Sequence, residues 1–254
     1  MSKNMLSTRL NDQQIAAIDA VIKECALQHL DGKEEMQKAF VMASGIRQLR
    51  ELITDDAMKD VMQLQGTSLG FRTDKDRDSG YSVAIVKDAL IEASLRGLRP
   101  IGNEWNIISG RVYVTKEGFA RLVREYPGMS DLELTPSVPR MKDGGALVTY
   151  RARFKIDGVP VEIEREIPVK VNNGMGADAI LGKATRKMLC AVYERLTGSE
   201  YSLPEGDVTD VAIEPEAKSR RSTITDSLPQ AVTPKPVLSE ADRFDLANAG
   251  DAKE

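Results

Sequence analysis

The sequence predicts an α+β fold of antiparallel β-hairpins packed with helices, a helical N-terminal section and a disordered C-terminal tail. Apolar residues recur at helical spacing in the first 66 residues. Two turn signals, Ser109-Gly110 and Asp157-Gly158, each lie between strand-like segments. After Pro204, Pro, Ser, Thr, Asp and Glu dominate and apolar periodicity disappears, which is typical of disorder. We therefore expect a helical section over 1–66, an α+β core over 67–202 and an acidic tail over 203–254.

The N-terminal section contains two expected helices and a shorter third one. Residues 14–30 and 33–53 each carry apolar side chains at helical spacing, and a further short helix is expected over 55–64. A polar segment punctuated by glycine, residues 66–80, then separates these helices from the core.

The first part of the core is expected to be a helix, a small hairpin and a second helix. Residues 82–97 have helical periodicity, and Gly97 is placed to cap the C-terminus. Segments 104–108 and 111–114 flank the Ser109-Gly110 turn and predict two strands. Thr115 is a suitable N-cap for a helix that continues to Glu125.

A second hairpin is the clearest local prediction. Even positions are apolar over 146–156 and odd positions are mostly apolar over 159–169, with Asp157-Gly158 between them. A two-residue turn there pairs Arg151 with Glu164 and Arg153 with Glu162 on the polar face. We interpret the basic residues of this face as part of a solvated ladder of cross-strand ion pairs rather than a site for phosphate groups.

The last expected helix covers 177–196. Its apolar face comprises Leu181, Met188, Leu189, Val192 and Leu196. At 100° per residue, Lys183 and Lys187 fall on the opposite face with Arg186 nearby. We therefore expect these three cations to face a ligand rather than the core.

Composition narrows the class of protein. The chain of 254 residues has a net charge of -4, but residues 203–254 hold eleven acidic and six basic residues, which leaves 28 acidic and 29 basic before them. No apolar stretch is long enough to span a membrane, and the N-terminus does not resemble a signal peptide. Two cysteines provide no disulfide framework. These features predict a cytoplasmic protein with no membrane partner.

Catalytic patterns fail on spacing. Five residues separate Gly176 from Gly182 and Ala184 follows Lys183, whereas a nucleotide-binding P-loop needs four residues and then Gly-Lys-Ser/Thr. Cys25 and His29 are too few ligands for a structural zinc site. We expect no catalytic residues, no cofactor and no metal. Two classes of protein stay open as alternatives to the hypothesis developed below. One is an enzyme that uses the glycine-rich loop and Lys183 on a phosphorylated substrate, and the other is a scaffold protein that binds no DNA.

Basic and aromatic residues remain as candidates for binding single-stranded nucleic acid, because cations neutralise phosphates and aromatic rings stack on bases. The basic candidates are Arg96, Arg99, Arg111, Lys116, Lys170, Lys183, Arg186 and Lys187. The stacking candidates are Trp105, Tyr113 and Phe119, although a place in the core is the favoured interpretation for these three rings.

Gly97, Leu98, Arg99 and Pro100 form a Gly-Leu-x-Pro stretch at the end of an expected helix. This stretch resembles the one that ends a helix in the RecT/Redβ type of bacteriophage single-strand annealing protein, and the resemblance covers residues 80–200. Gly102, Tyr113, Gly118 and Phe119 match its hairpin and following helix, although the aromatic-glycine order is reversed. The segment GKATRKMLCAVYERLTG, residues 182–198, matches a later Ala/Lys/Thr-rich helix. Erf-like annealing proteins are close rivals.

The resemblance implies ATP-independent binding and annealing of single-stranded DNA in phage homologous recombination. It implies a homo-oligomer, either a ring or a helical filament. It also implies a phage exonuclease and the host single-strand-binding protein as partners, which we expect the C-terminal tail to recruit.

Overall fold

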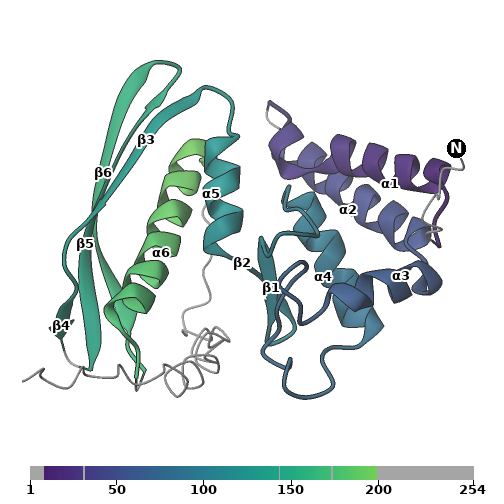
Figure 1. The fold of residues 1–254 in the computed structure, drawn as a ribbon. Coiled ribbons are helices and arrows are strands. Elements are labelled where there is room, and N and C mark those ends of the chain that lie inside the picture. Colours follow the sequence, from purple (N-terminus) through teal and green to yellow (C-terminus); the bar gives the residue numbers. More distant parts are fainter. Residues whose placement is uncertain (1–8, 31, 143, 173, 199–254) are drawn as a thin grey trace, which may run out of the picture. The chain divides into compact units, whose positions relative to one another are not determined.

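The computed structural model describes residues 9–30, 32–142, 144–172 and 174–198, which belong to a single unit. Helices and antiparallel sheets alternate along the chain, which confirms the predicted α+β class (Figure 1). The expected tail over 203–254 lies outside the described residues. The expectation that it recruits partner proteins therefore stays a prediction.

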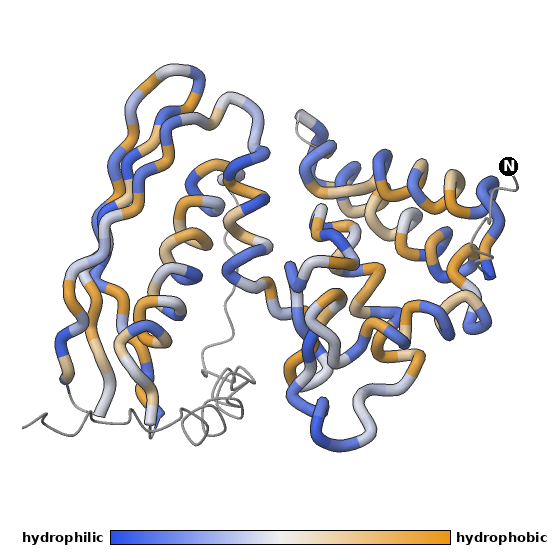
Figure 2. Tube along the Cα trace, viewed as in Figure 1, coloured by the Kyte–Doolittle hydropathy of each residue, from blue (hydrophilic) through white to orange (hydrophobic). Residues whose placement is uncertain are grey.

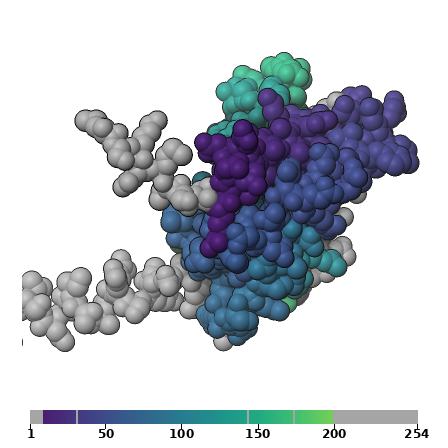
Figure 3. Space-filling view, turned by 90° about the vertical axis from the view of Figure 1, so that its right-hand side faces the viewer, coloured from purple at the N-terminus to yellow at the C-terminus, as the bar shows by residue number. Residues whose placement is uncertain are grey.

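The N-terminal section is helical, as predicted. It comprises α1 (Asp12–Cys25), α2 (Glu35–Leu52) and α3 (Asp55–Val61), with short 3-10 turns η1 (Leu27–His29) and η2 (Met62–Leu64). α1 begins at a reciprocal cap, in which Asn11 Oδ1 accepts from Gln14 N and Gln14 Oε1 accepts from Asn11 N. All three helices pack against α4 (Val83–Leu95). They contribute much of the surface seen in Figure 3.

The small hairpin and the helix after it also form as predicted. β1 (Trp105–Ile108) pairs with β2 (Arg111–Val114). Ser109 and Gly110 have φ angles of 52° and 73°, the left-handed values that a type I′ turn requires. Thr115 Oγ1 accepts a hydrogen bond from Gly118 N at 3.1 Å and so caps α5 (Lys116–Arg124).

The large sheet is built around β5 (Gly145–Ile156), which pairs along its whole length with β6 (Val159–Lys170) in the predicted register. Hydrophobic and hydrophilic residues alternate along both strands (Figure 2). Two strands were not predicted, β3 (Met129–Pro136) and β4 (Arg140–Lys142), which occupy the other edge of β5. A register shift interrupts β3 and all three residues of β4 are exposed, so neither has a clear alternating pattern.

The final helix, α6 (Ala177–Thr197), packs against β5 and β6 on one side and α5 on the other. A helix between two layers buries residues around its circumference, so the prediction of one apolar face and one solvent face is wrong. The buried residues are Ile180, Ala184, Arg186, Met188, Leu189, Cys190, Ala191, Val192, Tyr193 and Leu196.

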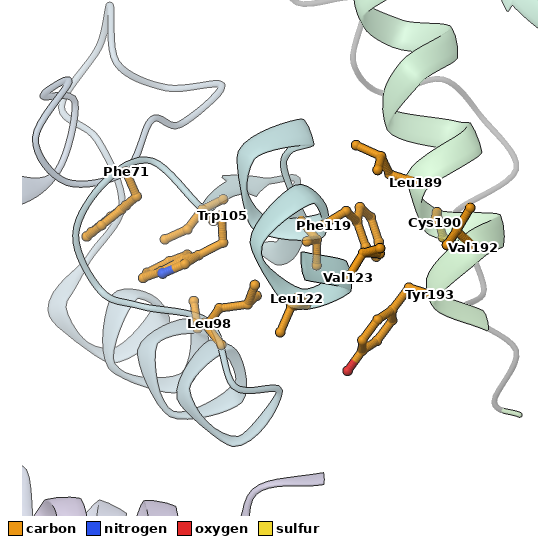
Figure 4. Packing of buried hydrophobic residues seen from close by; sticks show 14 of the residues in the cluster. Phe71, Leu98, Trp105, Phe119, Leu122, Val123, Leu189, Cys190, Val192 and Tyr193 are labelled. Atoms are coloured by element: carbon orange, nitrogen blue, oxygen red, sulfur yellow. The ribbon is translucent and has the colours of Figure 1, made fainter. Parts of the chain in front are cut away.

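One cluster of buried apolar residues extends from Val21 in α1 to Leu196 in α6. Figure 4 shows the part where Phe119 and Val123 of α5 lie between Trp105 and residues of α6. α1, α2 and α3, which precede the predicted boundary between residues 66 and 67, pack against α4, which follows it. These contacts do not mark a division at that point, so the boundary stays a prediction.

Candidate nucleic-acid interface

Lys187 joins α6 to the edge of the sheet. Its Nζ donates a hydrogen bond to the carbonyl oxygen of Pro168 in β6 at 2.8 Å. The two-residue turn makes Ile156 and Val159 a hydrogen-bonded pair, so even-numbered residues of β6 point their carbonyls away from β5. Pro168 has no N–H to offer a further strand, which suits its position at an edge. The ammonium group of Lys187 therefore lies at the outer side of β6.

Arg186 joins α6 to β2 instead. Its guanidinium carbon lies 4.2 Å from the centroid of the Tyr113 ring, and its Nη1 donates to Val114 O at 3.5 Å. Arg186 is only 7% exposed. The prediction that it shares an open face of the helix with Lys183 and Lys187 is therefore wrong, because α6 packs at this point against a strand that is far away in the sequence.

Lys183 lies between these two contacts around the helix. At 100° per residue it is 40° from Lys187 in one direction and 60° from Arg186 in the other. It is half-buried. The first half of α6 thus presents cations continuously from the β6 edge to β2.

β2 extends this arrangement at one end. Arg111 is two residues before Tyr113 on the same face of β2. Arg111 is exposed and forms no ion pair within the part of the chain that the structure describes. We define the cationic band as Arg111, Lys183, Arg186 and Lys187. Lys170 pairs with Gly145 and shares the outer face of β6 with Glu162 and Glu164, so it lies on the side of the sheet away from α6 and outside the band.

Sequence reasoning missed Lys142, which lies near Lys170 on the outer face of the sheet. Lys142 pairs with Gly145, which in turn pairs with Lys170. The two lysines therefore lie on one face, about 10 Å apart across three strands. Nothing in the sequence could have placed Lys142 there, because β4 has only three residues and no apolar alternation.

The remaining predicted basic residues each lie beside a carboxylate. Arg96 pairs with Glu92 at 2.6 Å, Arg99 with Glu125 at 3.1 Å and Lys116 with Glu117 at 3.6 Å. Each of these three cations therefore has a carboxylate as acceptor. Arg96, Arg99 and Lys116 lie outside the cationic band, which is defined by its position on α6 and β2.

The favoured interpretation, a place in the core, is confirmed for two of the three aromatic candidates. Trp105 is 1% exposed and stacks on Phe71, with ring centroids 4.4 Å apart and planes 14° from parallel (Figure 4). Phe119 is fully buried, with its ring centroid 6.2 Å from that of Tyr193. Both rings form part of the core and are closed to a base. Tyr113 is partly exposed but has Arg186 over its ring.

The interpretation of the outer sheet face as a salt ladder is confirmed. Arg151 pairs with Glu164 at 2.6 Å and Arg153 with Glu162 at 2.9 Å. The hydrogen bonds that Arg151 donates to the Glu164 carboxylate raise the pKa of Arg151. Lys155 pairs at 2.9 Å with Asp131, a partner supplied by the unpredicted strand β3.

Within the described ranges, no group of three or more His, Cys, Asp or Glu side chains could hold a metal ion. No helix in those same ranges is both long and apolar enough to cross a membrane. Comparison with known proteins found no matching family model, no matching curated protein and no matching solved structure.

Proposed function

We propose that this protein binds single-stranded DNA and anneals complementary strands without hydrolysing ATP. The observation that supports the proposal is the cationic band, in which Arg111 of β2 follows three cations of α6 that lie between β2 and the edge of β6. Cations arranged along a path suit a polyanionic strand better than a compact small molecule, because successive phosphates follow one another along the backbone.

Annealing requires little covalent chemistry from the protein. It needs phosphates neutralised well enough for two strands to approach, and bases left exposed for pairing. The burial of Trp105 and Phe119 supports backbone binding over base stacking, since neither ring is open to a base. A site that neutralises the backbone and does not read bases accepts strands of any sequence.

A single band is short, so we extend the proposal to a homo-oligomer. Several bands along one DNA strand multiply a weak affinity, because binding at the second band is intramolecular. Sedimentation of the full chain with and without an oligonucleotide tests this part. A monomer under both conditions, at concentrations where the oligonucleotide is bound, contradicts it.

The test of DNA binding compares two double variants. One loses two positive charges from the cationic band, and the other loses two positive charges from the salt ladder. Lys183→Ala with Lys187→Ala should weaken binding equally for all single-stranded sequences. It should also lower the slope of log affinity against log salt by roughly 0.7 per lost contact. The matched control is Arg151→Ala with Arg153→Ala, which removes the same charge from side chains that already have glutamate partners. We expect that control to leave the slope unchanged.

Two further measurements complete the test. Urea unfolding checks that the double variant still folds, because Lys187 loses its hydrogen bond to Pro168. Annealing of labelled complementary oligonucleotides is followed in buffer without ATP. The proposal is wrong if the folded Lys183→Ala, Lys187→Ala variant keeps the affinity, slope and annealing rate of the parent.

A further inference from the structure

Two arginines are buried to the same extent but in opposite electrostatic surroundings. Arg121 is 8% exposed and Arg186 is 7% exposed. Arg121 has two carboxylate partners, Glu104 at 2.5 Å and Glu125 at 2.8 Å, and also donates to Gly97 O at 2.6 Å. Arg186 has no carboxylate partner among the described residues, and its one hydrogen bond there, to Val114 O, is long at 3.5 Å.

The surroundings of Arg186 do not replace the missing counter-charge. Taking a charge out of water is costly unless an opposite charge or several hydrogen bonds compensate it. The Tyr113 ring offers a cation–π contact, which is a partial compensation. Cys190 lies one helical turn away, but burial raises the pKa of its thiol to about 12, so it carries no negative charge near neutral pH.

The guanidinium retains some contact with solvent. Among the described residues, Asn103 Oδ1 is the one fully buried side-chain nitrogen or oxygen that lacks a hydrogen bond. Arg186 Nε and Nη2 also form no hydrogen bond to a described residue, yet they are not among the fully buried atoms. Each of these two nitrogens therefore keeps some surface accessible to solvent. A guanidinium presents these donors in a fixed planar fork that fits two oxygens of a phosphate group.

We propose that Arg186 forms an anion subsite for one phosphate group, with Tyr113 as the platform beneath its guanidinium. Lys183 on α6 and Arg111 on β2 flank the subsite and supply further positive charge. The anion provides the counter-charge that Glu104 and Glu125 provide for Arg121. That the occupant is a phosphodiester of single-stranded DNA rests on the proposed function, whereas the subsite itself does not.

The experiment observes the two arginines in one spectrum. The full chain is labelled with ¹⁵N-arginine, and the Nε–H resonances are followed during titration with inorganic phosphate at constant ionic strength. Sodium chloride replaces the phosphate in the blank. Arg186→Lys identifies the Arg186 resonance by its loss. Tyr113→Leu identifies it independently, by removing the ring-current shift, if the lysine variant does not fold.

We expect the Arg186 resonance to move and saturate with phosphate, while the Arg121 resonance stays in place because its donors already have carboxylate partners. A second titration uses an oligothymidylate. Movement with phosphate but not with the bound oligothymidylate supports the subsite and counts against the proposed DNA path. An Arg186 resonance that moves with neither ligand, while exposed arginines respond, overturns the subsite.

Discussion

Arg121 and Glu104 form an ion pair in which both side chains are less than a tenth exposed, although they are seventeen positions apart in the sequence. Glu104 Oε2 also accepts a hydrogen bond from Arg99 N at 2.8 Å, so one carboxylate holds both α5 and the segment before β1. Desolvation alone lowers the pKa of Arg121, but its carboxylate partners outweigh it and the pKa is raised. This pair fixes the position of α5, against which α6 packs.

Breaking this pair should be costly. Arg121→Met leaves the buried Glu104 carboxylate without its cation and should destabilise the fold by about 3–5 kcal/mol. Urea unfolding measures the change. Arg121→Met with Glu104→Met should lose less than the sum of the two single variants, since neither charge is then left alone. Strict additivity of the three values would show that the contact contributes no coupling.

The fluorescence of Trp105 should be insensitive to DNA. The chain has a single tryptophan, and its indole is buried on Phe71 with Nε1 bonded to Arg99 O at 3.0 Å. We expect a short-wavelength emission maximum, weak iodide quenching, and no change in intensity with an oligonucleotide that binds by anisotropy. Quenching of this tryptophan on DNA binding, with no change in iodide access, would mean that a base reaches the ring.

Two glycines inside helices should respond oppositely to alanine. A Cβ at Gly182 in α6 would meet no atom within 4 Å, so Gly182→Ala should stabilise the protein by up to about 1 kcal/mol through helix propensity. A Cβ at Gly118 in α5 would lie 2.2 Å from Glu104 O, so Gly118→Ala should destabilise it by more than that gain. Thermal unfolding of both variants measures the difference. Equal shifts in the same direction would contradict the packing described for α5.

The Cys190 thiol should be unreactive in the folded protein. Burial raises its pKa from 9.0 to about 12, so the unfolded chain ionises first as the pH rises. The resulting stabilisation is complete below about pH 9 and is lost between pH 9 and 12. The Cys25→Ser variant leaves Cys190 as the single thiol, and its reaction with an aromatic disulfide at pH 8 should match the unfolding rate. Rapid reaction in the folded state would show that the thiol is accessible.

Local interactions determined the parts of the fold that the sequence predicted. The Asp157-Gly158 turn determines the register of β5 and β6, because shifting a strand by one residue would put its apolar side chains in solvent. Thr115 likewise determines where α5 begins, through a hydrogen bond three residues along the chain. The salt ladder follows from that same register.

Tertiary structure alone decided which candidate residues can meet a ligand. Trp105 and Phe119 lie in the core, because Phe71 and Tyr193 pack on them from segments distant in the sequence. Arg186 keeps only a small accessible surface because its guanidinium reaches Tyr113 and Val114 of β2, on a helix face that periodicity assigns to solvent. Helical spacing ranks the sides of one helix by polarity, but the layers on both sides of α6 determine which of its residues stay in water.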